Sequence, residues 1–537
     1  MRGLGKTRSL MIAASAAALL TGGAAQARGK MEISPFLGVD QTVVKDLKGG
    51  NGDTLTYTSV IVGVDARIQN RTTEVNANLA YQHQFTWSGE TTDSDVISGV
   101  VRARTKVARG LSLEGGALAT RVRTDGFTGA NGSLASADRK SQIYSLYGGP
   151  TLTTQVGDLS VNAAYRLAYN RLEDGFDGTV SGGATPLDSF DQSWSHVATA
   201  SVGMQPGVLL PFGWSVGAGY SREDASQLDQ RYEDKWGRVD ITMPVSTDLA
   251  VIGGVGYQSI KISSRDAVRD PVTDAPVRDS AGRFVTDESG PRILSYDNEE
   301  IIWDAGILWR PSRRTSLSLT VGHRYGSESV RASFSWQPDE RTSVSVSLYD
   351  SVDSFGRALS GNLANLPENF IVTRNPFSGD INGCAFGTGG NACFSDTLSG
   401  IRTANYRNRG ISASYSHSAG AWRYGLGLGY SRRKFLGDDP LFVNVNGRSD
   451  ENYFAAALLG YAIDDRSGID VNIYANQFNS GISGVGDVFN AGAYLSYHRS
   501  VTRRLQGHAS IGVDQVKAQG VDSVLTGLAQ IGIRYSF

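Results

Sequence analysis

The sequence predicts an all-β fold: a transmembrane, up-and-down antiparallel β-barrel of about 22 strands, with short periplasmic turns and long extracellular loops. Three observations predict this fold. Apolar and polar residues alternate along most of the chain, which is the period of a strand with two different faces. Tight and long connections alternate between these strands. The chain ends on an amphipathic strand whose last residue is Phe537.

Residues 1–27 are predicted to be a secretory signal peptide. A basic start precedes the apolar stretch SLMIAASAAALL and the small-residue sequence AQA, so cleavage is expected after Ala27. The alternative is a buried or anchoring N-terminal helix. The predicted mature domain is the barrel, residues 28–537, in the outer membrane of a Gram-negative bacterium. No internal stretch reaches the ~20 continuous apolar residues of a membrane-spanning helix.

The alternating segments give a strand count of about 22, with a margin of about two, and an even count suits a closed up-and-down barrel. Every long loop follows an odd-numbered strand, and nearly every connection after an even-numbered strand is a tight turn, which supports the count. The long loops are predicted at residues 124–141, 172–191, 263–298 and 351–404, and no segment after the signal shows a helical period over a comparable length. The predicted strands are 31–44, 54–68, 72–85, 96–108, 111–123, 142–155, 158–171, 192–204, 213–223, 235–246, 248–262, 299–310, 315–325, 328–337, 341–350, 405–417, 421–433, 450–463, 468–477, 488–499, 503–515 and 523–537.

The two faces of these strands favour lipid outside and water inside. In AWRYGLGLGYSRR, Trp422 and Tyr430 bracket Leu426 and Leu428 on one face, and Arg423 with three glycines lies opposite. A soluble β-sandwich or solenoid also alternates, but its core would not accept charged side chains without partners. Hydrocarbon forbids open sheet edges, so such a sheet must close.

The two cysteines, Cys384 and Cys393, lie in one Gly- and Asn-rich stretch, INGCAFGTGGNACF. In an oxidising compartment such a close pair predicts a disulfide that stiffens a loop tip. Metal binding is the alternative, which the lack of a nearby histidine disfavours.

Catalytic, cofactor and metal motifs are not found in the sequence. The six histidines are scattered, and no phosphate loop, zinc motif or nucleophile elbow is present. The formal net charge of -2 gives no reason to expect nucleic acid as a partner. We therefore predict that the chain is not an enzyme and uses no cofactor.

A set of arginines is predicted to face the lumen, because each alternates with apolar neighbours along its strand. An inward excess of guanidinium groups would concentrate anions such as uronic-acid sugars or phosphate. The alternative is that acidic residues pair with them and leave a neutral, cross-braced lumen. The predicted inward arginines are Arg102, Arg104, Arg166, Arg310, Arg324, Arg331, Arg423 and Arg534.

The predicted barrel is wide enough to need a plug or to leak. Strand signals begin soon after residue 28, which leaves no room for an N-terminal plug domain. Folded-in loops or a partner protein would have to seal it. The loop 263–298 is one candidate for a constriction, although it also suits a mobile surface loop.

The first third of the chain resembles the outer-membrane β-barrel proteins associated with exosortase/PEP-CTERM and exopolysaccharide systems. The likeness is carried by EISPFLGVDQ, LTYTSVIVGVDA and SQIYSLYGGPTLTTQVGDLSVNAAYRLAYNR. It implies a barrel of unproven function that accompanies polysaccharide export. The aromatic ending, with Tyr535 and Phe537, also resembles the C-terminal insertion signal of outer-membrane proteins, which the barrel-insertion machinery reads.

The sequence therefore predicts a pore or channel associated with exopolysaccharide secretion. The expected partners are outer-membrane lipids, the barrel-insertion machinery, an anionic polysaccharide and periplasmic export proteins. The alternatives are a general diffusion porin, a non-transporting structural barrel and an outer-membrane hydrolase.

Overall fold

The chain is described by a computed structural model, which confirms the predicted fold class: an all-β, closed, antiparallel barrel of 22 strands. The predicted signal peptide, residues 1–27, lies outside the described residues. The structure describes residues 30–49, 52, 54–88, 94–123, 140–173, 190–279, 283–367, 369–388, 390–398, 403–437, 446–481, 486–520 and 522–537.

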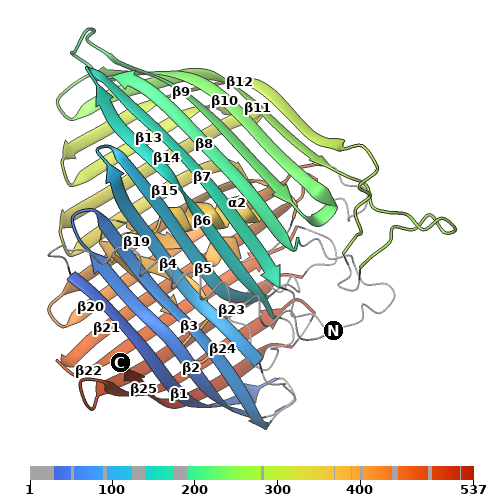
Figure 1. Ribbon diagram of the computed structural model, residues 1–537, viewed down its shortest axis with the longest axis vertical. Coiled ribbons are helices and arrows are strands. Elements are labelled where there is room, and N and C mark those ends of the chain that lie inside the picture. The colour runs from blue at the N-terminus through green and yellow to red at the C-terminus, as the bar shows by residue number, and fades with distance from the viewer. Residues whose placement is uncertain are drawn as a thin grey trace.

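The barrel strands run in chain order around the wall, each antiparallel to the next, and β1 closes the ring by pairing with β25 (Figure 1). They are β1 (Lys30–Lys48), β2 (Thr54–Gln69), β3 (Thr73–Ser88), β4 (Ser94–Ala108), β5 (Leu111–Arg123), β6 (Lys140–Val156), β7 (Leu159–Glu173), β8 (Gln192–Met204), β9 (Gly213–Ala225), β10 (Gln230–Pro244), β11 (Leu249–Ser264), β12 (Ile293–Ser312), β13 (Thr315–Arg324), β14 (Ser327–Asp339), β15 (Thr342–Asp353), β19 (Tyr406–Ala419), β20 (Trp422–Phe435), β21 (Ser449–Asp464), β22 (Ser467–Asn479), β23 (Val488–Ser500), β24 (Leu505–Ala518) and β25 (Val524–Ser536).

Each predicted strand overlaps one barrel strand. The largest differences are at the long-loop ends, where β10 begins at Gln230 instead of 235 and β12 begins at Ile293 instead of 299. There the backbone ladder continues beyond the apolar pattern, and ion pairs such as Lys261 with Asp297 and Arg231 with Asp224 replace lipid-facing side chains. Apolar alternation alone therefore underestimates these strands.

The outer face of the barrel is apolar and is bordered by aromatic rings. Leu426 and Leu428 are 41% and 44% exposed on this face. Trp422 lies 4.4 Å from the ring of Tyr461 near the short turns. Near the long loops, Tyr430 and its neighbour Tyr453 lie 4.8 Å apart. This banding is that of an outer-membrane barrel. Within the described ranges, no helix is long and apolar enough to cross a membrane.

The loop between β11 and β12 lies outside the barrel, where it forms a narrow ribbon held by isolated bridges such as Ala267 to Thr286 (yellow-green in Figure 1). It is therefore not the constriction that was one of the two alternatives for residues 263–298. The predicted long loops 124–141 and 172–191 fall mostly outside the described residues.

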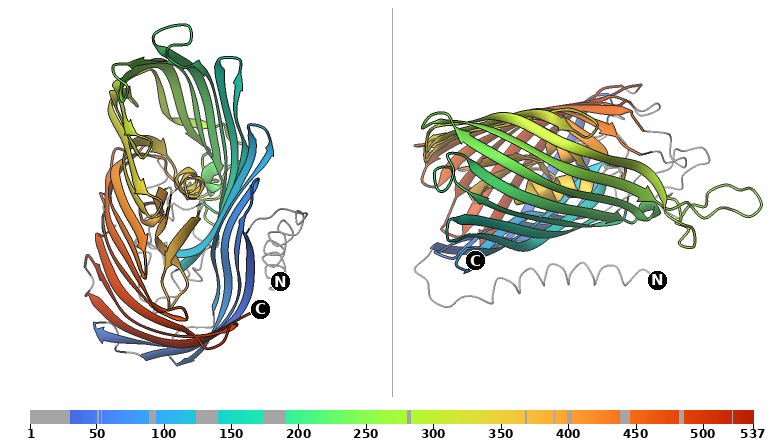
Figure 2. Two further views of the ribbon diagram at one scale, coloured as in Figure 1. Left: turned by 90° about the vertical axis from the view of Figure 1, so that its left-hand side faces the viewer. Right: turned by 90° about the horizontal axis from the view of Figure 1, so that it is seen from above.

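The connection between β15 and β19 enters the lumen in its described parts, 354–367, 369–388, 390–398 and 403–405, and we call residues 354–405 the inserted segment. Its elements lie inside the ring of strands when the barrel is viewed along its axis (gold in Figure 2). The sequence pattern predicted only a long loop over residues 351–404, whereas the structure shows regular elements there. It contains α2 (Phe355–Ala364), β16 (Asn369–Arg374), β17 (Ile381–Thr388), β18 (Gly390–Cys393) and α3 (Ser395–Leu398), and β16, β17 and β18 form a separate sheet.

Local sequence explains why α2 forms. Ser354 caps the helix by accepting a hydrogen bond from the backbone N–H of Arg357 at 3.2 Å. Phe355, Leu359 and Leu363 follow at four-residue spacing and share one buried face. The helix is short, so this packing stabilises it more than helix propensity does.

Candidate functional site: the lumen and its inserted segment

The inner wall is apolar where α2 docks. Phe355, Leu359 and Leu363 pack against inward-facing side chains of β4–β7, including Val100 and Tyr147, and all five are nearly fully buried. An apolar patch on the lumen face of a wide barrel would be unfavourable if it were exposed to water. The helix covers this patch, which therefore serves as its packing surface.

An arginine of the helix is fastened to the neighbouring strands β9 and β10. Arg357 Nη1 donates to Glu223 Oε2 of β9 at 3.1 Å, and both side chains are less than a tenth exposed. Its guanidinium also lies 3.5 Å from the ring centroid of Tyr232 on β10. Ser354 donates a further hydrogen bond to Glu223. These contacts hold both ends of the first helical turn.

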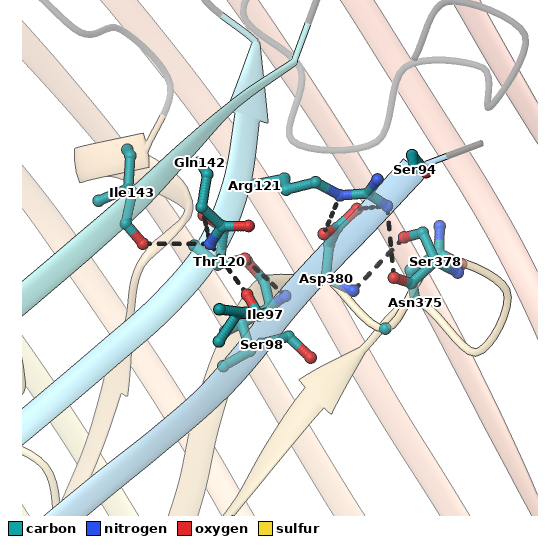
Figure 3. A network of polar contacts seen from close by, with 12 residues as sticks. Ser94, Ile97, Ser98, Thr120, Arg121, Gln142, Ile143, Asn375, Ser378 and Asp380 are labelled. Atoms are coloured by element: carbon teal, nitrogen blue, oxygen red, sulfur yellow. Dashed lines mark hydrogen bonds and ion pairs between the residues drawn. The ribbon is translucent and has the colours of Figure 1, made fainter. Parts of the chain in front are cut away.

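The turn that follows β16 is held by a second buried ion pair. Arg121 of β5 donates from Nε and Nη2 to the two carboxylate oxygens of Asp380, at 3.0 and 3.2 Å (Figure 3). The backbone N–H of Ile381 donates to Thr120 Oγ1 at 2.9 Å beside it. Asn375 closes the turn by accepting a bond from the backbone N–H of Phe377 at 2.9 Å.

Arg374 is a partly buried cation that is held by neutral acceptors. Its guanidinium donates to Ser98 Oγ and to the backbone oxygen of Gly379, each at 3.0 Å, and to Asn78 of β3. Burial lowers the pKa of Arg374 to about 10. The hydrogen bonds from wall to segment at this point compensate the desolvation of the charge.

The same turn reaches the far side of the barrel. Phe377 is fully buried and its ring lies 5.7 Å from that of Tyr494 on β23. The hydroxyl of Tyr57 on β2 donates to the backbone oxygen of Phe377 at 3.1 Å. Asn375 donates to the hydroxyl of Tyr494 at 3.1 Å. The inserted segment therefore braces opposite walls of the barrel.

Cys384 and Cys393 are joined by a disulfide that ties β17 to β18. This hairpin seats on glycines of β20. A Cβ at Gly427 would lie 2.6 Å from the sulfur of Cys384 and 2.9 Å from that of Cys393, and a Cβ at Gly425 would lie 2.7 Å from the ring of Phe386. Because Gly425 and Gly427 have no side chains, the hairpin can pack directly against the backbone of β20.

The structure places each predicted inward arginine against a specific partner or at a strand end. Four bind carboxylates: Arg104 with Glu114, Arg331 with Asp304, Arg423 with Asp470, and Arg534 with Asp65. Two others donate to neutral oxygens: Arg102 to the backbone of Leu366 and Arg324 to Gln258. Arg166 lies 5.5 Å from the ring centroid of Tyr147, and Arg310 is exposed at the end of β12.

These contacts favour the cross-braced lumen over an anion-attracting one. Arg331, for example, meets the carboxylate of Asp304 at 2.9 Å, and Arg423 meets that of Asp470 at 2.9 Å. Opposite charges at this separation cancel most of each other's field in water beyond a few ångströms. The charge pattern therefore does not indicate a preference for anionic solutes.

Sequence reasoning missed the residues that hold the inserted segment, Arg121, Glu223, Arg357 and Asp380. The apolar spacing of α2 and its Ser354 cap were readable signals. The ion pairs were not readable, because their members lie more than 100 residues apart.

At the C-terminus, the rings of Tyr535 and Phe537 lie 5.2 Å apart, and the backbone N–H of Phe537 donates to Pro35. The terminus is thus an aromatic pair at the short-turn edge, beside the start of β1. Among the residues that the structure describes, no three His, Cys, Asp or Glu side chains gather where they would hold a metal ion.

No protein-family model and no curated protein matches this chain. Among solved structures, it is similar to the ferric-catecholate import receptor Fiu of E. coli, with 10% identity, a TM-score of 0.41, and coverage of 92% of this chain and 81% of that one. The FrpB iron transporter of Neisseria meningitidis matches with 11% identity, a TM-score of 0.43, and coverage of 94% and 82%. The siderophore receptor PirA of Acinetobacter baumannii matches with 9% identity, a TM-score of 0.40, and coverage of 95% and 81%. Similarity at this level does not assign an activity. The assignment of the barrel fold depends on the strand pairing of this chain itself.

Proposed function

We propose that this chain is an outer-membrane transport barrel whose own inserted segment, residues 354–405, obstructs the lumen. The observation that carries the proposal is that the segment is fastened to β9 and β5 by two buried ion pairs, Arg357 with Glu223 and Arg121 with Asp380, and contacts β23 across the lumen through Phe377. A purely structural barrel would need no such fastening across its interior. A barrel of this width leaks unless something seals its lumen.

Planar-bilayer recording of the purified chain tests the proposal. We expect a small or intermittent conductance for the complete chain. Replacing residues 355–404 by a short Gly/Ser linker should give a large, steady conductance. The matched control removes residues 268–285 from the external ribbon, which should leave the conductance unchanged. Equal conductance with and without the inserted segment would remove the proposed seal, and no conductance from either protein would favour a structural barrel.

Export of an anionic polysaccharide is a narrower form of this proposal. It is supported by the resemblance of the first third of the sequence to exopolysaccharide-associated barrels. The inward arginines support it less than the sequence alone suggested, because Arg104, Arg331, Arg423 and Arg534 are engaged by carboxylates. Deleting the gene and measuring released polysaccharide tests it, and unchanged export would contradict it.

A further inference from the structure

Part of the inner wall is lined by two rows of serines. On β13, β14, β15 and β19, serines lie directly opposite one another across three successive strand pairs. We call these residues the serine wall. The first row is Ser318, Ser333, Ser347 and Ser412, and the second row is Ser316, Ser335, Ser345 and Ser414.

The serine wall faces the lumen and keeps contact with water. Ser416, which shares its face with Ser412 and Ser414, donates to the backbone oxygen of Gly387 in the inserted hairpin at 3.3 Å, and this sets the inward direction. Ser416 is covered there, whereas Ser333 and Ser335 are exposed. The hairpin tip therefore borders the wall without covering it.

A band of paired charges continues the serine wall along the barrel. Arg238 of β10 donates two bonds to Asp304 of β12, each 3.0 Å, and Asp304 also accepts a bond from Arg331 of β14 at 2.9 Å. Asp240 accepts from Arg238 Nε at 2.9 Å. We call these four residues the ionic ladder. Two guanidinium groups and two carboxylates make its net charge zero.

Glycines on the intervening strands allow the ionic ladder to lie flat. A Cβ at Gly254 of β11 would collide with Arg238 and Asp240, and a Cβ at Gly322 of β13 would lie 2.7 Å from Asp304 Cβ. Because these positions lack side chains, the charged groups reach across each strand along the wall. Asp240 and Arg331 lie at the two ends of the ionic ladder, and the side chain of each is 36% exposed. Both side chains can therefore form hydrogen bonds with a solute.

An aromatic ring completes the band. Trp236 lies on the same face of β10 as Arg238, and its indole covers the backbone of Gly219 on β9. The ring remains partly exposed. An indole lying flat on a wall offers an apolar, electron-rich face to the apolar C–H face of a sugar ring.

We propose that the serine wall, the ionic ladder and Trp236 form a binding track for a neutral, polyhydroxylated chain, that is, a glycan without net charge. Serine hydroxyls both donate and accept, as sugar hydroxyls do, so each row matches a chain of hydroxyl groups. The zero net charge of the ladder removes a preference for uronate over neutral sugar. The inference rests on the proposed transport function, and names the solute class that would pass this wall.

Calorimetric titration of the purified full-length chain in detergent tests the track. Maltohexaose is the neutral probe, hexagalacturonate is the charged probe of equal length, and polyethylene glycol is the chain without hydroxyl groups along its length. We expect maltohexaose to bind, polyethylene glycol not to bind, and hexagalacturonate to bind no tighter than maltohexaose. Absence of maltohexaose binding, or uronate binding more than tenfold tighter, would overturn the inference.

Two sets of variants locate the binding. The combination S333A/S335A/S345A/S347A should weaken maltohexaose binding at least tenfold. The control S201A/S215A removes lumen-facing serines of β8 and β9 and should leave binding unchanged. Trp236→Ala should weaken binding more than Trp236→Phe, which keeps a ring. Equal binding by all variants would overturn the inference.

Each variant is first checked for the heat-dependent gel shift of a folded barrel. Bilayer conductance of the variant without residues 355–404 separates the two proposals. Large conductance without sugar binding would refute the track alone, whereas no conductance would refute the transport function.

Discussion

Removing the carboxylate of Asp380 should release the inserted segment from β5. Arg121 and Asp380 form a two-point ion pair, and their side chains are only 8% and 3% exposed. Asp380→Leu therefore leaves a buried guanidinium whose remaining partner is the backbone oxygen of Ser378 at 3.4 Å. Breaking one side of such a pair costs about 3–5 kcal/mol.

The expected size of the effect follows from this cost. About 3 kcal/mol corresponds to a change on the order of 10²-fold in an equilibrium constant. If the docked and released states of the segment interconvert, the ratio of open to closed time in single-channel records should rise by about that factor.

The double variant R121M/D380L is the matched control. It removes both charges, so no uncompensated ion stays buried, and such replacements are often neutral in stability. We expect its open-to-closed ratio to lie near that of the natural chain. The reasoning would be refuted if Asp380→Leu opened no more often than the natural chain, or if the double variant opened as often as the single one.

Three further predictions concern the hairpin, the lumen charges and the C-terminus. Gly427→Val should displace the disulfide hairpin, because its Cβ would lie within 2.9 Å of both sulfurs, and the conductance should rise. In the control Gly507→Ala, no heavy atom lies within 4 Å of the added Cβ, so the conductance should not change. Asp304→Asn removes the carboxylate shared by Arg238 and Arg331. The reversal potential in a salt gradient should therefore shift toward anion selectivity. An unshifted potential would contradict the claim that Asp304 neutralises these two arginines. Removing Phe537 should lower the amount of heat-modifiable barrel in the outer-membrane fraction without changing expression, whereas an unchanged amount would argue against an insertion signal.

The sequence alone determined the barrel. Lipid, water and backbone hydrogen bonding act on every strand in the same way, so two-residue alternation and turn length were sufficient to locate all 22 barrel strands. The same local rule placed the outward leucines of β20, Leu426 and Leu428, and the inward Arg423 opposite them.

Tertiary structure decided what fills the barrel. Residues 354–405 read as a loop because their helix is ten residues long and their strands are short, and these elements are stabilised by packing against the barrel wall, as α2 is against the apolar patch of β4–β7. The pairs Arg121 with Asp380 and Arg357 with Glu223 join strands and turns far apart in the chain. Side-chain direction follows from local periodicity, but the partner that a side chain meets depends on how the ring closes. Alternation therefore predicted which arginines belong inside, and only the closed structure showed that carboxylates already meet half of them.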